Sequence, residues 1–299
     1  MMWFFFCFLL TMFLVKLLYR LHLTTSYVKT NQAYYVYYSF VCKYHLQHVE
    51  QFHSEYSHEP VTLGIVACLW VMQLYGYYHV PDYAPAIEPL VRHDEFCLGR
   101  MPGGDYVLVY KGMSSNVDYY RTMFDDDMRQ LPVLVDGRAV RVIGKWWNMV
   151  NAFLADGRVE QVLKQSEKLW VFGFSRGGVL AEYTALRLKQ YHQQIGLCTL
   201  GKPMAGDREY VAVMDALYTS PVADESLLGR NVRCVVVGDP IVTLPLASFT
   251  QKSEGWYPTQ MQTAVWLEHK NTDYLWKYHT LRTYYRALMR LKKERTTNV

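Results

Sequence analysis

The chain has 299 residues, of which 51% are hydrophobic and 19% are charged. It is therefore long enough for one large domain with an extension, and too apolar for an intrinsically disordered protein. The formal net charge is only +4, and no basic run alternates with aromatic residues. We therefore expect no nucleic-acid partner.

Six cysteines are spread along the chain without C-x-x-C spacing. They are Cys7, Cys42, Cys68, Cys97, Cys198 and Cys234. This spacing disfavours a zinc site and a disulfide scaffold, and it favours buried thiols in a reducing compartment.

The first segment of the chain is strongly apolar. Residues 1–15 contain no charge. With the Lys16 side chain reaching the membrane interface, the apolar stretch within residues 1–20 is nearly as long as the roughly 20 residues that a bilayer span requires. We predict an uncleaved anchor rather than a cleaved signal peptide, because no basic residue precedes the apolar run and no small-x-small site follows it. Lys16, Arg20 and Lys29 then place the downstream domain in the cytosol. A cleaved signal would instead make the protein secreted or lumenal.

We expect three parts along the chain: residues 1–20 as anchor or signal-like segment, residues 21–60 as an N-terminal extension, and residues 61–299 as one α/β domain. Within the extension, residues 34–58 contain four histidines: His45, His48, His53 and His58. No cysteine or carboxylate cluster completes a metal site around them, so no metal is expected.

A second apolar run, VTLGIVACLWVMQLY, occupies residues 61–75. It is shorter than a bilayer span, contains Gln73 and precedes Gly76 and Pro81. These features favour a buried core helix over a second span.

Residues 169–188, LWVFGFSRGGVLAEYTALRL, combine a short apolar run, a Gly-rich turn and a helical pattern. The run predicts a buried strand, and Val179, Tyr183 and Leu186 at i, i+4 and i+7 predict a helix lying on a sheet. Between strand and helix stands Gly173-Phe174-Ser175-Arg176-Gly177, a G-x-S-x-G turn of the kind that exposes a nucleophilic serine.

Each part of this turn has a chemical reason. Ser175 attacks well only if it is exposed and held beside a base, and Gly173 and Gly177 leave room for a strained turn packed on its strand. Main-chain N–H groups at the start of the helix, that of Arg176 included, would face a developing oxyanion. We interpret residues 173–177 as the nucleophile elbow of a serine hydrolase.

A candidate acid follows in residues 231–245, NVRCVVVGDPIVTLP. A β-branched strand over Val232–Val237 stops before Asp239, which places this carboxylate just past a strand end, where α/β sheets gather functional groups. The alternative is an ordinary turn aspartate before proline. Two histidines, His269 and His279, come later, and the residues alone leave open which is the base.

Together these segments resemble the class 3 lipase family, which contains fungal triacylglycerol lipases and diacylglycerol lipases. Four blocks over roughly residues 104–285 carry the resemblance. Residues 106–120 are similar to the family's strand and Phe-Arg-Gly-Thr/Ser turn, and residues 173–177 to Gly-His-Ser-Leu-Gly. Residues 199–211 are similar to Phe-Gly-x-Pro-Arg-x-Gly-Asn, and residues 237–245 to Asp-x-Val-Pro-x-Leu-Pro. The order of the blocks is specific, whereas no single block is.

The resemblance implies a role for each candidate catalytic residue. Ser175 becomes the nucleophile and Asp239 the acid that orients the histidine. His279 becomes the general base, because the family's histidine precedes a tyrosine-containing helix, as in HTLRTYY here. His269 is the weaker candidate.

The same resemblance assigns the oxyanion hole to the main-chain N–H groups of Met113 and Arg176. Residues 114–128 then correspond to the segment in which related lipases carry a mobile lid helix, with a fixed surface helix as the competing interpretation. Asp125–Asp127 lack the spacing of a calcium loop.

Four residues depart from the family pattern: Lys111 for arginine, Met113 for serine or threonine, Phe174 for histidine, and Arg176 for leucine. Only Met113 touches the implied mechanism directly. Family members offer both an N–H and a hydroxyl at this position, and Met113 offers only the N–H. The departure bears on the expected rate more than on the type of reaction.

We expect an α/β-hydrolase-like fold with a mostly parallel sheet flanked by helices. The expected function is lipid ester hydrolysis of acylglycerol-type substrates at a membrane surface through a Ser-Asp-His triad, without cofactor. One alternative is a non-lipid serine hydrolase, such as a thioesterase or peptidase, on the same fold. The other is a membrane-bound pseudoenzyme that acts as an interaction protein. The departures from the family pattern at Met113 and Phe174 favour this alternative.

Overall fold

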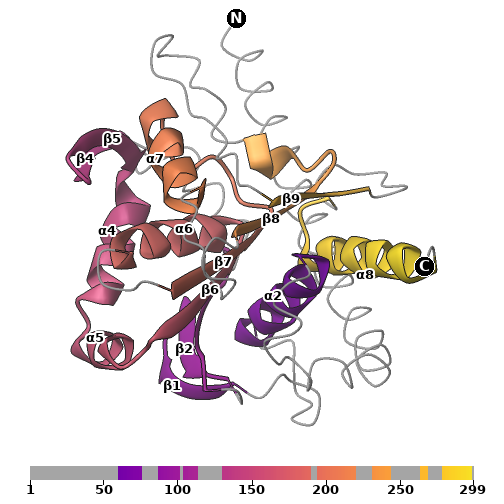
Figure 1. Ribbon diagram of the computed structural model, residues 1–299, viewed down its shortest axis with the longest axis horizontal. Coiled ribbons are helices and arrows are strands. Elements are labelled where there is room, and N and C mark those ends of the chain that lie inside the picture. Colours follow the sequence, from indigo (N-terminus) through magenta and orange to yellow (C-terminus); the bar gives the residue numbers. More distant parts are fainter. Residues whose placement is uncertain are drawn as a thin grey trace, which may run out of the picture. The chain divides into compact units, whose positions relative to one another are not determined.

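The computed structural model describes the chain over residues 60–75, 87–101, 104–113, 130–189, 194–219, 231–243, 263–268 and 278–297 (Figure 1). Several predictions lie outside these ranges: the anchor at residues 1–20, the histidines of the extension, the lid segment at residues 114–128, and His269. Within the described ranges, no helix has both the length and the apolar character to cross a bilayer.

Most of the described strands belong to one sheet. In spatial order they are β1 (Glu88–Arg92), β2 (Phe96–Arg100), β3 (Tyr106–Tyr110), β6 (Lys168–Phe174), β7 (Gln194–Leu200), β8 (Asn231–Val236) and β9 (Thr263–Leu267). The pairings of β1 with β2 and of β2 with β3 are antiparallel, whereas β3, β6, β7, β8 and β9 are parallel to one another. The predicted mostly parallel sheet is confirmed.

A separate hairpin pairs β4 (Gln130–Val135) with β5 (Arg138–Ile143). Asp136 and Gly137 form its turn with φ of 48° and 76°, because a two-residue turn that matches strand twist needs two positive φ angles. After it, α5 (Gly157–Lys164) packs beside β1.

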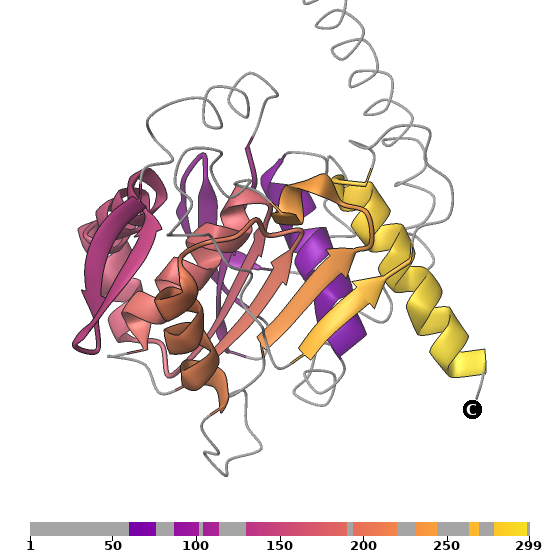
Figure 2. The same ribbon diagram turned by 90° about the horizontal axis from the view of Figure 1, so that it is seen from above.

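Helices cover both faces of the main sheet (Figure 2). On one face α6 (Arg176–Leu188) packs on β3, β6 and β7, with α4 (Gly144–Leu154) against α6 and α7 (Arg208–Thr219) against β5. On the other face α2 (Pro60–Leu74) crosses β3, β6, β7 and β8, and α8 (Leu281–Thr297) packs on α2, β8 and β9. These flanking helices complete the predicted layered architecture.

Two helices are buried more deeply than an amphipathic surface helix. The prediction of a core helix at residues 61–75 is confirmed by α2, in which Trp70 is 2% exposed and meets Phe172 of β6 edge-on at 5.0 Å. In α6 the predicted apolar stripe is buried, but Leu180 and Leu188, which lie outside it, are buried as well. Because α4 covers a further side of α6, the helix buries more than one face.

The loops that follow β3, β6 and β8 leave the sheet at the same edge, because these strands are parallel. They carry Met113, Ser175 and Asp239. β8 ends at Val236, one residue earlier than predicted, and Asp239 still stands just past the strand. This carboxyl-terminal edge is where α/β sheets place their functional groups.

Candidate active site

Ser175 stands in the predicted sharp turn between β6 and α6. Its φ of 56° and ψ of −127° are strained for a residue with a Cβ atom. A Cβ atom at Gly173 would collide with the carbonyl oxygen of Gly177, and one at Gly177 with that of Lys111. The two glycines of the elbow are therefore required by close contacts between backbone segments.

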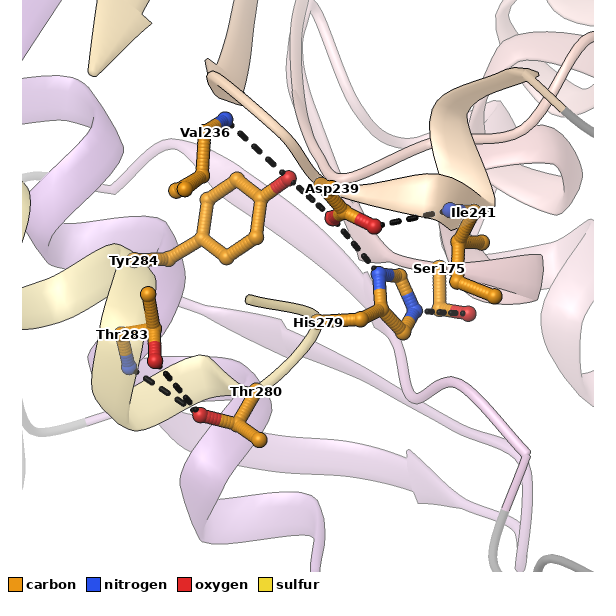
Figure 3. A network of polar contacts seen from close by, with 8 residues as sticks. All are labelled: Ser175, Val236, Asp239, Ile241, His279, Thr280, Thr283 and Tyr284. Atoms are coloured by element: carbon orange, nitrogen blue, oxygen red, sulfur yellow. Dashed lines mark hydrogen bonds and ion pairs between the residues drawn. The ribbon is translucent and has the colours of Figure 1, made fainter. Parts of the chain in front are cut away.

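The side chains of Ser175, Asp239 and His279 form one chain of contacts (Figure 3). His279 Nε2 lies 2.8 Å from Ser175 Oγ, and His279 Nδ1 lies 2.8 Å from Asp239 Oδ2. An ionised carboxylate only accepts hydrogen bonds, so Nδ1 donates to it and Nε2 is left to accept from the serine hydroxyl. Ser175 and Asp239 are buried, and the His279 side chain is 12% exposed.

The Asp239 carboxylate is also held by two other donors. The N–H of Ile241, in the short helix η5 (Pro240–Thr243), donates to Oδ1 at 2.8 Å, and the hydroxyl of Tyr284 from α8 donates to Oδ2 at 2.6 Å. The N–H of Val236 in turn donates to the Tyr284 hydroxyl at 3.3 Å. Burial, reinforced by the Asp239 charge, raises the pKa of Tyr284, so this hydroxyl stays protonated and remains a donor.

An aromatic side chain covers the imidazole. The rings of Phe174 and His279 are stacked, with centroids 4.8 Å apart and an interplanar angle of 22°. The ring of Tyr284 meets Phe174 edge-on at 5.9 Å. Phe174 stands where the class 3 lipase pattern has histidine, and it packs on His279 without offering a competing hydrogen bond.

The two residues predicted for the oxyanion hole lie on adjoining segments. Arg176 is the first residue of α6, where main-chain N–H groups have no partner within the helix. The loop after β3 runs beside the serine, since a Cβ atom at Gly112 would stand 3.0 Å from Ser175 Cβ. Met113 follows directly, and its carbonyl accepts a hydrogen bond from Tyr75 at the end of α2 (3.4 Å).

Three contacts of this site were not predicted from the sequence: the hydrogen bond from Tyr284, the stacking of Phe174, and an ion pair between Glu95 and Arg176. Tyr284 had a signal, because it follows His279 in the helical segment HTLRTYY. Glu95 had none, since it lies 81 residues before its partner. In the described part of the chain, no cluster of histidine, cysteine or acidic residues is arranged to hold a metal ion.

The mostly parallel sheet with helices on both faces and a serine in the strand-to-helix turn defines the α/β-hydrolase class of fold. The sequence model of the family "Lipase (class 3)" matches residues 107–249. Over this range the chain matches the class 3 lipase family, to which its motifs are similar.

Solved structures of lipases share the fold. The triacylglyceride lipase of Rhizomucor miehei has a TM-score of 0.53 and 18% identity, over 70% of this chain and 81% of that one. A triacylglycerol lipase with a serine protease triad as its catalytic centre has a TM-score of 0.53 and 16% identity, over 78% and 94% of the two chains. A lipase from Rhizopus microsporus var. chinensis has a TM-score of 0.50 and 16% identity, over 71% and 75%. A comparison with curated proteins gave no match.

Proposed function

We propose that this protein is a serine-dependent lipid ester hydrolase. Ser175 is the nucleophile, His279 the general base, and Asp239 the acid that orients the base. The observation that carries the proposal is the chain of two 2.8 Å contacts from Ser175 through His279 to Asp239. A nucleophile, a base and a third group that fixes the base are the geometric requirement of such a centre.

In the proposed reaction, Ser175 Oγ attacks the carbonyl carbon of an ester while its proton passes to His279 Nε2. The carbonyl oxygen becomes an oxyanion, which the main-chain N–H groups of Met113 and Arg176 stabilise. His279 returns the proton to the leaving alcohol oxygen, and the acyl group stays on Ser175. Water then attacks in the same way, so that one ester and one water give one alcohol and one carboxylic acid.

The proposed substrates are acylglycerol-type lipids at a membrane surface, because residues 107–249 match the model of the class 3 lipase family. Fold alone does not fix the substrate. A panel of acylglycerols, acyl thioesters and peptides therefore tests this choice, and the highest kcat/KM is expected on an acylglycerol. A clear preference for thioesters or peptides would replace lipid ester hydrolysis with the other reaction.

A serine-reactive fluorophosphonate tests the centre itself. The wild-type protein is expected to be labelled, and folded Ser175→Ala to remain unlabelled. Ser166→Ala is the matched control and should be labelled like the wild type, because the buried Ser166 hydroxyl donates to the carbonyl of Leu163 (2.7 Å) and is no part of the proposed centre. An unlabelled wild type would point to a pseudoenzyme, and a labelled Ser175→Ala would contradict the elbow assignment.

Met113 provides a prediction about rate. Loss of one oxyanion donor lowers kcat by about a hundredfold or more, roughly 3 kcal/mol, so an added hydroxyl should raise it. We expect Met113→Ser and Met113→Thr to raise kcat on a short-chain ester while KM changes less. The gain in kcat should be smaller than the loss caused by removing a donor, because no neighbouring side chains are arranged to hold the new hydroxyl in place. Met149→Ser is the control, because it makes the same exchange at a half-buried residue of α4. An unchanged kcat in well-folded Met113 variants would remove Met113 from the oxyanion hole.

From the residue pattern alone, we also propose that residues 1–20 anchor the enzyme in a membrane, with the catalytic domain in the cytosol. The full-length protein should stay with membranes after an alkaline carbonate wash, because its apolar segment approaches the length of a bilayer span. A chain that begins after Arg20 should be released. Release of the full-length protein would instead favour a cleaved signal and a secreted or lumenal enzyme.

A further inference from the structure

Glu95 lies in the turn between β1 and β2 and contacts two segments of the site at once. Its main-chain carbonyl accepts a hydrogen bond from the N–H of Lys111 at 3.1 Å. Its carboxylate Oε2 forms an ion pair with Nη2 of Arg176. The N–H of Glu95 donates to Nδ1 of His93 at 3.2 Å, which fixes the turn itself.

These two segments carry the donors of the proposed oxyanion hole. Lys111 precedes Met113 by two residues in the loop after β3, and Arg176 is the first residue of α6. Glu95 therefore holds one segment through its main chain and the other through its side chain. An oxyanion hole works only when both donors point at one oxygen, so a contact that joins the two segments bears on its geometry.

The ion pair is shielded from solvent, since the side chains of Arg176 and Glu95 are 12% and 23% exposed. Such a pair adds little net stability, because desolvation opposes the attraction, but removal of one partner leaves the other charge buried and uncompensated. Among the residues that the structure describes, Arg176 Nε has no hydrogen-bond partner. Within this part of the chain, the Arg176 guanidinium is thus bound through Nη2 to Glu95 and not through Nε.

We propose that Glu95 is a positioning residue that sets the geometry of the oxyanion hole through Arg176 and Lys111. This inference rests on the proposed function, because the two N–H groups matter only if Ser175 attacks a carbonyl. It also accounts for a departure from the class 3 lipase pattern. The arginine at position 176, where the pattern has leucine, is the partner that lets Glu95 hold the elbow to the turn.

Steady-state kinetics of Glu95→Gln on a short-chain ester test the inference. This variant keeps the main-chain carbonyl and removes the charge. We expect kcat to fall by about 10- to 100-fold with KM changed less than about twofold, because displaced donors weaken the transition state and not the bound ester. Glu160→Gln is the matched control, since Glu160 pairs with Lys164 on the surface of α5, and it should keep the wild-type kcat.

Arg176→Leu removes the same ion pair from the other side. It leaves no buried cation behind, and it keeps the main-chain N–H of residue 176. It should also lower kcat, and the double variant with Glu95→Gln should be no slower than the slower single variant. The positioning role would be overturned if the kcat losses of the two single variants multiplied in the double variant. It would also be overturned if Glu95→Gln had the same kcat as Glu160→Gln. An inactive wild-type protein is a separate result, because it would overturn the proposed function and this inference with it.

Discussion

Replacement of His279 by alanine is expected to lower kcat by about 10⁴-fold or more, as much as Ser175→Ala does. The two losses should be similar because the proposed nucleophile and base act as a unit, and removal of either one ends the same proton transfer. Asp239→Asn should lower kcat by a similar order, since an amide at this position holds the imidazole in the wrong tautomer. The measurement is kcat on a soluble short-chain ester for variants that melt like the wild type.

His269→Ala is the control for this prediction. The residues alone left His269 and His279 as alternative bases. His279 contacts Ser175 and Asp239 at 2.8 Å, whereas His269 lies outside the described residues. We expect His269→Ala to keep kcat within a few-fold of the wild type. If His269→Ala were the inactive variant and His279→Ala the mild one, the base would have to be reassigned.

The elbow could be predicted from sequence because its causes are local. The strand, the turn and the helix are contiguous, and a Cβ atom at Gly173 would meet backbone atoms of Gly177 within the same turn. The same holds for Asp239, which a β-branched strand delivers to the sheet edge. Local patterns therefore predicted the fold class and the position of Asp239 just past a strand end.

The contacts between distant segments could not be predicted in this way. The His279–Ser175 contact spans 104 positions and the Arg176–Glu95 pair spans 81. Periodicity carries no information about such pairs, because it reports which face of an element is buried and not what covers it. The histidine was chosen by family resemblance, and Glu95 was missed because no motif contains it.

A buried ion pair under the elbow helix was missed for the same reason. Glu182 of α6 and Lys202, which follows β7, are both 0% exposed, with Oε2 and Nζ 3.0 Å apart. The hydroxyl of Tyr210 donates to Glu182 Oε2 at 2.9 Å, and Lys202 Nζ donates to the carbonyl of Pro203 at 3.2 Å. Burial lowers the pKa of Lys202 to about 8, against the opposing attraction of Glu182.

Lys202 lies against the first turn of α6. A Cβ atom at Gly178, three residues after Ser175, would stand 2.9 Å from Lys202 Cβ. The lysine side chain thus packs against the helix that begins at the serine. Its sequence context, TLGKPMAGD, marks the segment as part of the family pattern and gives no sign that the lysine is buried.

We expect Lys202→Met to lower the free energy of unfolding by about 3–5 kcal/mol, because it removes the ion-pair partner Lys202 from the buried Glu182 carboxylate. The double variant Lys202→Met with Glu182→Gln should recover most of this loss, since neither charge remains. Lys164→Met is the matched control: its ion pair with Glu160, with side chains 73% and 53% exposed, should be worth less than about 0.5 kcal/mol. Urea unfolding of the four proteins gives the comparison. Equal losses for Lys202→Met and Lys164→Met, or no recovery in the double variant, would mean that charge compensation at Glu182 does not hold this part of the elbow helix in place.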